Sequence, residues 1–409
     1  MPDIPRQPEI NIGATGHVDH GKTTLVEGLT GVWTSAHSEE LRRGITIKVG
    51  YADVAFYKCE SCPPPGNYFI VSKCPNCKNE AKLLRVVSFV DAPGHESLMA
   101  NTLSGASLMD GSLLVIAANE KVPQPQTREH LIALQMLGMK HIVIAQNKID
   151  LIDDDQALST YQSINSLLKN TVAEKSPIIP ISAQHKINID SIIESIEKYI
   201  PTPKRDLTAN PLMHVLRSFD VNKPGLDINA INGGVVGGSI LKGKLKVGDE
   251  VEFSPGILDI SGSNYNSINT KILTIATSAG LVDEASPGGL IALGTSLDPS
   301  ITKSDSLLGC VIGKVNELPE TYNSINLEYD LFDSAIGSEG LLKVDQITKN
   351  ENLRINSGTA ISVGKTSLIK NDSVTIDLTK PICAEPNSRV AISRRIGGRW
   401  RLIGSGSLK

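Results

Sequence analysis

The first two hundred residues alternate between short apolar runs and segments whose apolar residues recur at helical spacing. Ile10, Ile12 and Ala14 alternate with polar or small residues as in a strand. The segment Thr24 to Leu29 then predicts a helix that ends at Gly31. Together the pattern predicts an α/β domain with a doubly wound, mostly parallel sheet. The further predicted elements are strands at Val86 to Val90, Ser112 to Ala117, His141 to Ala145 and Pro177 to Ile181, and helices at Thr127 to Leu137 and Asn188 to Tyr199.

The pattern changes after Pro201-Thr202-Pro203, a segment that breaks regular structure. Beyond it, short runs of alternating apolar and polar residues are separated by Gly, Asn, Asp and Ser, with little helical periodicity. This is typical of β-barrels, and the length allows two of them, divided near Glu320. We therefore expect three domains at residues 1–203, 204–320 and 321–409.

The most informative chemistry follows the first predicted strand. Residues 16–23 read Gly-His-Val-Asp-His-Gly-Lys-Thr and fit the pattern of a phosphate-binding P-loop. The glycines let backbone N–H groups turn towards an anion, Lys22 can reach the outer phosphates, and the Thr23 hydroxyl can ligate Mg²⁺. The next helix begins at this loop, so its dipole favours a bound phosphate.

A second strand leads into Asp91-Ala92-Pro93-Gly94-His95. An Asp at this strand end can hold the Mg²⁺ shell, and Gly94 leaves its N–H free to meet a γ-phosphate. The segment Arg42-Arg43-Gly44-Ile45-Thr46 lies between the P-loop and Asp91. Thr46 can complete the Mg²⁺ shell only when a γ-phosphate is present, which would make the segment a switch. The alternative is a solvated basic turn.

A third strand leads into Asn147-Lys148-Ile149-Asp150. The Asp150 carboxylate can accept hydrogen bonds from N1–H and the 2-amino group of guanine, a donor pair that adenine lacks. Asn147 can support the O6 and N7 side, the Lys148 stem can lie over the ring, and the backbone of Ser182-Ala183-Gln184 can close the pocket at O6. These strand-end positions match ligand binding at the carboxyl edge of a doubly wound sheet. We therefore predict a site for GTP or GDP with Mg²⁺.

Asp19 is an unusual residue for this loop because phosphates repel a carboxylate unless it points away or shares a cation. We expect it to point outward, and a second Mg²⁺ contact is the alternative. The full predicted set for nucleotide and Mg²⁺ is Asp19, His20, Gly21, Lys22, Thr23, Thr24, Gly44, Thr46, Asp91, Gly94, Asn147, Lys148, Asp150, Ser182, Ala183 and Gln184.

Four of the 6 cysteines form the pairs Cys59-x-x-Cys62 and Cys74-x-x-Cys77. Two such pairs at this separation suit tetrahedral Zn²⁺, because each places two thiolates on one side of the metal. A secretory signal is not evident, which disfavours disulfides. Four thiolates leave no open position for a substrate, so we predict a structural zinc knuckle at residues 59–77. A reduced, metal-free knuckle is the alternative.

The composition supports globular folding throughout, with 40% apolar residues and no apolar run long enough for a membrane span. We expect a cytoplasmic protein with no membrane or DNA partner. The net charge is −4, so any RNA surface must be local. Candidates are Arg42, Arg43 and Lys48 at the switch and a group of arginines near the carboxyl terminus, for which a solvated strand face is the alternative. That group is Arg389, Arg394, Arg395, Arg399 and Arg401.

The four nucleotide motifs together resemble those of the translational GTPases that carry aminoacyl-tRNA. In that family the histidine after D-x-P-G orients the attacking water, which here implies His95. In that family, two apolar side chains keep the histidine away from the attacking water until the ribosome acts. Val18 and Ile45 hold the matching positions in this sequence. The resemblance also implies that Tyr51 lies near the terminal adenosine of the tRNA, although core packing is an open alternative.

The zinc knuckle narrows the resemblance to one group within that family, because the knuckle lies between the switch threonine and Asp91. The chain is similar over essentially its whole length to the γ subunits of the archaeal and eukaryotic translation initiation factor. The short, Pro-rich zinc loop departs from that family's pattern. The resemblance implies GTP hydrolysis, initiator methionyl-tRNA and the small ribosomal subunit as partners, and α and β subunits. Alternatives are a selenocysteine-specific or general elongation factor, the GTPase subunit of a sulfate-activating enzyme, and a scaffold with an idle GTPase.

Overall fold

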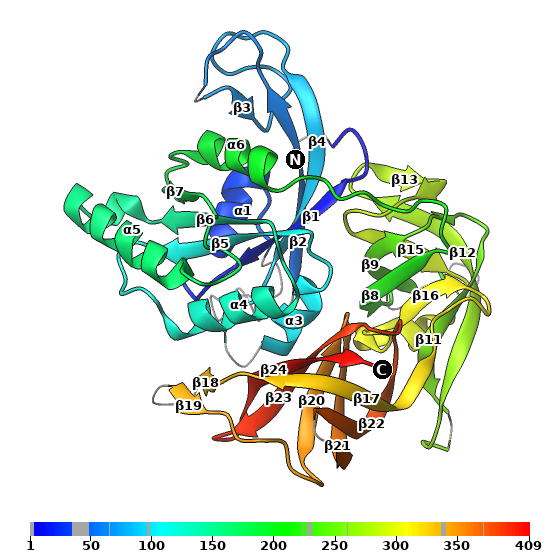
Figure 1. The fold of residues 1–409 in the computed structure, drawn as a ribbon. Coiled ribbons are helices and arrows are strands. Elements are labelled where there is room, and N and C mark those ends of the chain that lie inside the picture. Colours follow the sequence, from blue (N-terminus) through cyan, green and yellow to red (C-terminus); the bar gives the residue numbers. More distant parts are fainter. Residues whose placement is uncertain are drawn as a thin grey trace. The chain divides into compact units, whose positions relative to one another are not determined.

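The computed structural model describes residues 4–34, 49–64, 66–95, 99–223, 225, 227, 231–259, 261–336, 341–370 and 372–409. The chain divides into two compact units, Met1–Lys204 and Arg205–Lys409. In Figure 1 the first unit runs from blue to green and the second from green to red.

The first unit is built on a sheet with the strand order β3-β2-β4-β1-β5-β6-β7. Strands β4, β1, β5, β6 and β7 pair in parallel, whereas β2 is antiparallel to both β3 and β4. The prediction of a mostly parallel sheet is thus confirmed. The strands are β1 (Ile10–Thr15), β2 (Gly50–Lys58), β3 (Tyr68–Phe69), β4 (Lys82–Asp91), β5 (Gly111–Ala117), β6 (Ile142–Asn147) and β7 (Ile178–Pro180).

Helices cover both faces of this sheet. Figure 1 shows α1 and α6 on one side and α3 and α4 on the other. Helix α1 ends at Gly31, as predicted, in a left-handed conformation with φ 74°. The helices are α1 (Lys22–Thr30), α3 (Met99–Ala106), α4 (Pro125–Met136), the 3₁₀ turn η2 (Ile149–Leu151), α5 (Asp154–Leu168) and α6 (Ile189–Tyr199).

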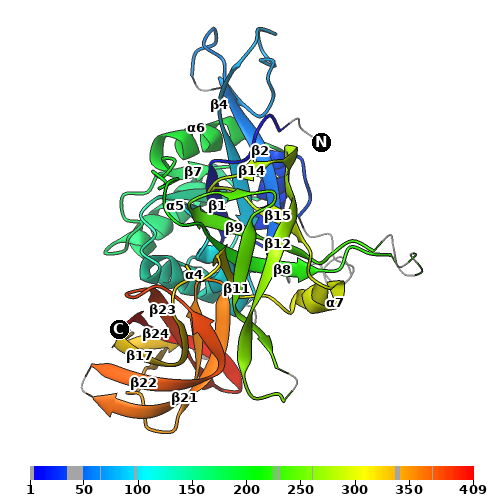
Figure 2. The ribbon, with the colours of Figure 1, turned by 90° about the vertical axis from the view of Figure 1, so that its right-hand side faces the viewer.

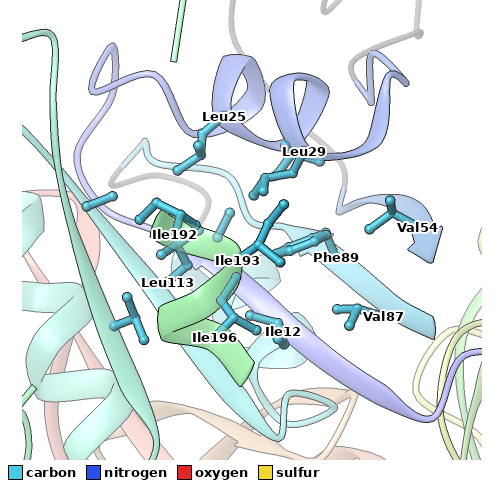
Figure 3. Packing of buried hydrophobic residues seen from close by; sticks show 14 of the residues in the cluster. Ile12, Leu25, Leu29, Val54, Val87, Phe89, Leu113, Ile192, Ile193 and Ile196 are labelled. Carbon is cyan, nitrogen blue, oxygen red and sulfur yellow. The ribbon is translucent and has the colours of Figure 1, made fainter. Parts of the chain in front are cut away.

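The core of the first unit lies between the sheet and the two helices α1 and α6. Apolar side chains from both helices converge over the strands, as Figure 3 shows. Burial of each such side chain contributes about 1.5–3 kcal/mol, so this layer holds the P-loop and the strand ends in fixed positions. The labelled side chains are Leu25 and Leu29 of α1, Ile192, Ile193 and Ile196 of α6, and Ile12, Val54, Val87, Phe89 and Leu113 of the strands.

The second unit begins with a barrel in which β11-β16-β8-β9-β15-β12 follow one another and β11 pairs with β12 to close the ring. Its core is formed by inward-facing Val, Ile, Leu and Phe side chains. The elements are β8 (Leu212–Phe219), β9 (Val235–Lys242), β10 (Leu245–Lys246), β11 (Glu250–Leu258), β12 (Tyr265–Thr277), β13 (Gly280–Val282), β14 (Glu284–Ala285), β15 (Ile291–Thr295), α7 (Pro299–Thr302), η4 (Lys303–Asp305) and β16 (Val311–Lys314).

A second closed barrel follows in the order β17-β22-β21-β20-β23-β24, drawn in orange and red in Figure 2. The prediction of two β-barrels after an α/β domain is confirmed. Among the described residues, no helix is both long enough and apolar enough to cross a membrane. The elements are β17 (Thr321–Leu331), β18 (Ser334–Ile336), β19 (Leu341–Lys343), β20 (Asn352–Ser357), β21 (Ala360–Lys370), β22 (Ser373–Cys383), β23 (Arg389–Ile396) and β24 (Arg399–Leu408).

Candidate functional site

The P-loop connects β1 to α1 at the carboxyl edge of the sheet. Gly16 and Gly21 take φ values of 134° and 86°, which side chains with a Cβ rarely adopt. A Cβ at Gly16 would also collide with the carbonyl of Val115, and one at Gly21 with the amide of Asn147. Both glycines are therefore required by the close packing of the loop against β5 and β6.

Lys22 is the buried cation of the loop, with 6% of its surface exposed. Its Nζ donates to the carbonyl oxygen of His17 at 2.7 Å. Burial lowers the pKa of Lys22 to about 8, and the carboxylates of Asp91 and Asp19 oppose that shift. Because this value still lies above 7, the ammonium remains mostly protonated at neutral pH and carries a charge that suits phosphate oxygens.

Asp91 lies fully buried at the end of β4 and collects two hydroxyl groups. Its Oδ2 accepts from the Thr23 Oγ1 at 2.8 Å and from the Thr34 Oγ1 at 2.6 Å. The structure thus brings together Thr23 and Asp91, which the sequence places 68 residues apart. Oxygen donors of this kind suit Mg²⁺, which binds carboxylates and hydroxyls together with substrate phosphates. Thr34 was not among the predicted ligands.

Gly94 and His95 follow Asp91, and Gly94 lies against the loop. A Cβ at Gly94 would press on the Lys22 Nζ, the Val18 amide nitrogen and the Gly16 carbonyl oxygen. The glycine therefore permits close approach of this segment to the P-loop. His95 and Val18 are both partly exposed. The predicted switch residues Gly44, Ile45 and Thr46 lie outside the described residues, so their roles stay predictions.

Asn147 links two parts of the site through its buried amide. Its Nδ2 donates to the His20 carbonyl oxygen at 2.9 Å, and its Oδ1 accepts from the Ala183 N–H at 2.9 Å. The side chain is only 2% exposed. The structure therefore gives Asn147 a role that sequence reasoning missed, because it ties the P-loop to the segment Ser182 to Gln184. The predicted contact with guanine stays a prediction.

The remaining residues of the predicted base pocket follow Asn147 or lie on the loop that it bonds. Lys148 takes a left-handed conformation with φ 64°, and its Nζ lies 3.9 Å from a carboxylate oxygen of Glu120. Asp150 Oδ2 lies 3.7 Å from the Nε2 of His185. Ser182 uses its Oγ to accept from the His185 N–H at 3.3 Å, which shapes the loop after β7. Asp19, Thr24 and Gln184 are partly or fully exposed around this centre.

His20 is the histidine of the P-loop that packs inward, with 1% exposed. Its Nδ1 lies 3.1 Å from the Val115 carbonyl oxygen, so Nδ1 carries the proton. Burial lowers the pKa of His20 to about 3, and the ring is therefore neutral. His20 therefore supports the loop from its buried side. Its ring centroid lies 5.0 Å from the centroid of the His17 ring.

The four predicted zinc ligands converge beyond the end of β2. The Sγ atoms of the cluster Cys59, Cys62, Cys74 and Cys77 all lie within 4.8 Å of one another. Two of the separations are 3.5 Å and 3.7 Å, close to the roughly 3.8 Å expected between thiolates on tetrahedral Zn²⁺ with bonds of about 2.3 Å. The donor set and spacing therefore fit a structural zinc site.

The candidate RNA surface near the carboxyl terminus is smaller than its sequence suggests. Arg394 forms an ion pair with Glu351 and donates to two backbone carbonyls, at Asp345 and Gln346. Arg401 is buried with 4% exposed. Arg394 and Arg401 are therefore held within the fold. Arg389, Arg395 and Arg399 are exposed, and Arg395 donates from Nε to the Gly398 carbonyl oxygen at 3.1 Å.

Comparisons with known proteins agree with this architecture. The family described as Elongation factor Tu GTP binding domain matches residues 7–202, and the family described as Initiation factor eIF2 gamma, C terminal matches residues 323–408. A protein of Archaeoglobus fulgidus named Translation initiation factor 2 subunit gamma is 54% identical over 100% of this chain and 96% of its own length. The chain belongs to the translation initiation factor 2 gamma family. A relative of the same name from Pyrococcus horikoshii is also 54% identical, over 99% of this chain and 98% of its own.

Solved structures show the same fold at lower identity. A bacterial selenocysteine-specific elongation factor matches 98% of this chain and 58% of its own, with a TM-score of 0.72 and 23% identity. The elongation factor SelB from Methanococcus maripaludis, in complex with a GTP analogue, matches 99% and 80%, with a TM-score of 0.73 and 23% identity. The first unit of this gamma family member is a translational GTPase domain, so the ligands of its P-loop are GTP or GDP with Mg²⁺.

Proposed function

We propose that this gamma family member is a GTP-gated carrier of initiator methionyl-tRNA to the small ribosomal subunit. It hydrolyses GTP when the start site is selected. The observation that supports this most strongly is 54% identity over the whole chain to proteins named as initiation factor 2 gamma subunits. The same names support α and β subunits as partners. Lower identity to the two solved elongation factors supports the fold alone.

The residues of the first unit fit the parts of this function. Lys22 and the P-loop N–H groups would hold the phosphates. Asp150, Lys148 and the loop at Ser182 to Gln184 would hold guanine. Thr23 and Asp91, with their oxygens 2.8 Å apart, would hold Mg²⁺. When bound, the ion would neutralise charge that develops between the β- and γ-phosphates.

Hydrolysis requires a positioned water. His95 would orient that water, and Val18 and Ile45 would keep the imidazole away until the ribosome acts. His95→Ala should leave GTP affinity within a few-fold and lower ribosome-stimulated hydrolysis by about 10²-fold, which is the scale of losing one positioned catalytic group. Turnover at the wild-type rate would remove His95 from the proposed mechanism.

The zinc knuckle would stabilise the long connection between β2 and β4 and carry no chemistry. Two backbone hydrogen bonds already shape it, from the Cys59 N–H to the Asn67 carbonyl at 2.8 Å and from the Cys74 N–H to the Asn79 carbonyl at 2.9 Å. The cysteine sulfurs supply all four ligands that structural zinc requires.

Binding of charged tRNAs tests the function most broadly. The GTP-bound chain is titrated in a filter assay with methionylated initiator tRNA and, separately, with methionylated elongator tRNA. Both titrations are made with the α subunit present and with it absent. The proposal predicts clear preference for the initiator. Equal affinity for both would favour an elongation-type carrier, and no binding of either would favour a sulfate-activating enzyme or a scaffold.

A further inference from the structure

Helix α4 contributes one buried polar group to the start of the P-loop. His130, with 1% of its surface exposed, has its Nδ1 3.2 Å from the backbone nitrogen of Gly16. Because the backbone N–H is the donor, Nδ1 accepts and the imidazole carries its proton on Nε2. The first glycine of the P-loop is therefore held by a side chain 114 residues further along the sequence.

The same glycine is confined on other sides by backbone. A Cβ at Gly16 would collide with the Val115 carbonyl of β5, and the carbonyl of Gly16 lies against Gly94. The peptide that enters the loop thus has β5 on one side, the Gly94 segment on another, and the imidazole as its hydrogen-bond acceptor. Its orientation sets where the following N–H groups of the loop point.

His130 is an unfavourable choice for packing alone. Its Nε2 is buried and has no hydrogen-bond partner among the described residues. An unsatisfied buried donor destabilises the fold, and a leucine of similar volume would not carry that donor. Burial lowers the pKa of His130 to about 3, which keeps the ring neutral and leaves the Nδ1 lone pair available. Among the described residues, the hydrogen bond of the imidazole is the one from the Gly16 N–H to Nδ1.

We propose that His130 is a positioning residue for the bound guanine nucleotide, acting through the hydrogen bond from the Gly16 N–H to its Nδ1. This inference rests on the proposed nucleotide site. Without the acceptor, the Gly16 N–H is buried and unsatisfied, and the loop gains other orientations in which its N–H groups no longer converge on the phosphates. GDP and GTP should both dissociate faster, because the loop contacts phosphates that the two nucleotides share.

The test compares three variants of the full chain by the release of a fluorescent GDP analogue in stopped flow. His130→Leu fills the space without an acceptor. His130→Asn places its Oδ1 near the position of Nδ1, whereas His130→Gln places its amide further out, near Nε2. We expect His130→Leu and His130→Gln to release the analogue about tenfold faster, which corresponds to about 1.4 kcal/mol. His130→Asn should stay within about threefold of wild type.

Thermal unfolding separates positioning from packing. The midpoint of His130→Leu should stay close to that of wild type, because the variant removes one unsatisfied buried donor at Nε2 and leaves another at the Gly16 N–H. Wild-type release from both Leu and Gln variants would overturn the inference. So would equal acceleration in all three variants with lowered midpoints, since that result indicates loss of packing. Failure of the wild-type chain to bind the analogue would instead contradict the proposed nucleotide site, and this inference with it.

Discussion

Asn147→Ala separates two parts of the proposed nucleotide site that one buried amide holds together. In the wild-type chain Nδ2 bonds the P-loop at the His20 carbonyl, and Oδ1 bonds the Ala183 N–H of the loop after β7, each at 2.9 Å. Alanine removes both bonds and leaves one acceptor and one donor in a region that is almost fully buried. The P-loop and the base-pocket loop are then free to move apart.

The magnitude follows from the two groups that lose their partner. Each unsatisfied buried group costs about 1–3 kcal/mol, so the pair costs roughly 2 kcal/mol even at the low end. Since about 1.4 kcal/mol is a factor of ten in an equilibrium constant, nucleotide affinity should fall by roughly 30-fold. The free energy of unfolding should fall only by the part of this cost that the nucleotide-free chain also bears.

Gln146→Ala is the matched control. Gln146 precedes Asn147 on β6, is equally buried at 2% exposed, and donates from Nε2 to the Ala157 carbonyl at 2.8 Å. That bond fixes α5 and does not touch the P-loop. Fluorescent GDP titration and denaturant unfolding should show that both variants lose stability and that only Asn147→Ala loses affinity. Unchanged affinity in Asn147→Ala, or equal losses of affinity in both variants, would refute the linking role.

Three further predictions test other parts of the account. Asp150→Asn should weaken GTP binding and favour xanthosine triphosphate, because the amide can donate to the xanthine 2-oxo group; unchanged guanine preference in a competition assay would reject the role of Asp150. Cys59→Ser with Cys74→Ser should lose the single zinc found per chain by metal analysis while GTP binding survives, and wild-type protein purified without chelator but free of zinc would contradict the knuckle. Burial lowers the pKa of His214 to about 4, so between roughly pH 6.5 and 4 the unfolded chain binds more protons and stability falls as pH falls. His214→Gln should flatten that part of a pH series of unfolding midpoints, and an unaltered slope would count against it.

Several elements could be predicted from the sequence because their signals are local. Helix α6 has isoleucines at helical spacing, and Ile192, Ile193 and Ile196 are all buried. The cysteine pairs carry the spacing of a zinc knuckle within 19 residues. The P-loop pattern lies between a strand and a helix, as the structure has it. In each case the residues that act together are close in sequence.

Other features could not be predicted because their partners are distant or their pattern is weak. Helix α5 is not among the predicted elements, because Ile164 and Leu168 are the only buried residues of this helix and leave little apolar periodicity. The bond of His130 to Gly16 spans 114 residues, and that of Asn147 to the P-loop spans 127. Nothing in the local sequence of either residue indicates its acceptor or donor.

The central claim is that the nucleotide controls the cargo. A ligand shifts an equilibrium only through different affinities for its states, so initiator methionyl-tRNA must bind more tightly when the chain holds a non-hydrolysable GTP analogue than when it holds GDP. The direct measurement is the dissociation constant of that tRNA in both nucleotide states at one fixed salt concentration, because phosphate contacts make the affinity salt-dependent. It is made with the α subunit present. The account predicts tighter binding with the GTP analogue and a smaller gap for Thr46→Ala, whereas equal affinity in both nucleotide states would contradict it.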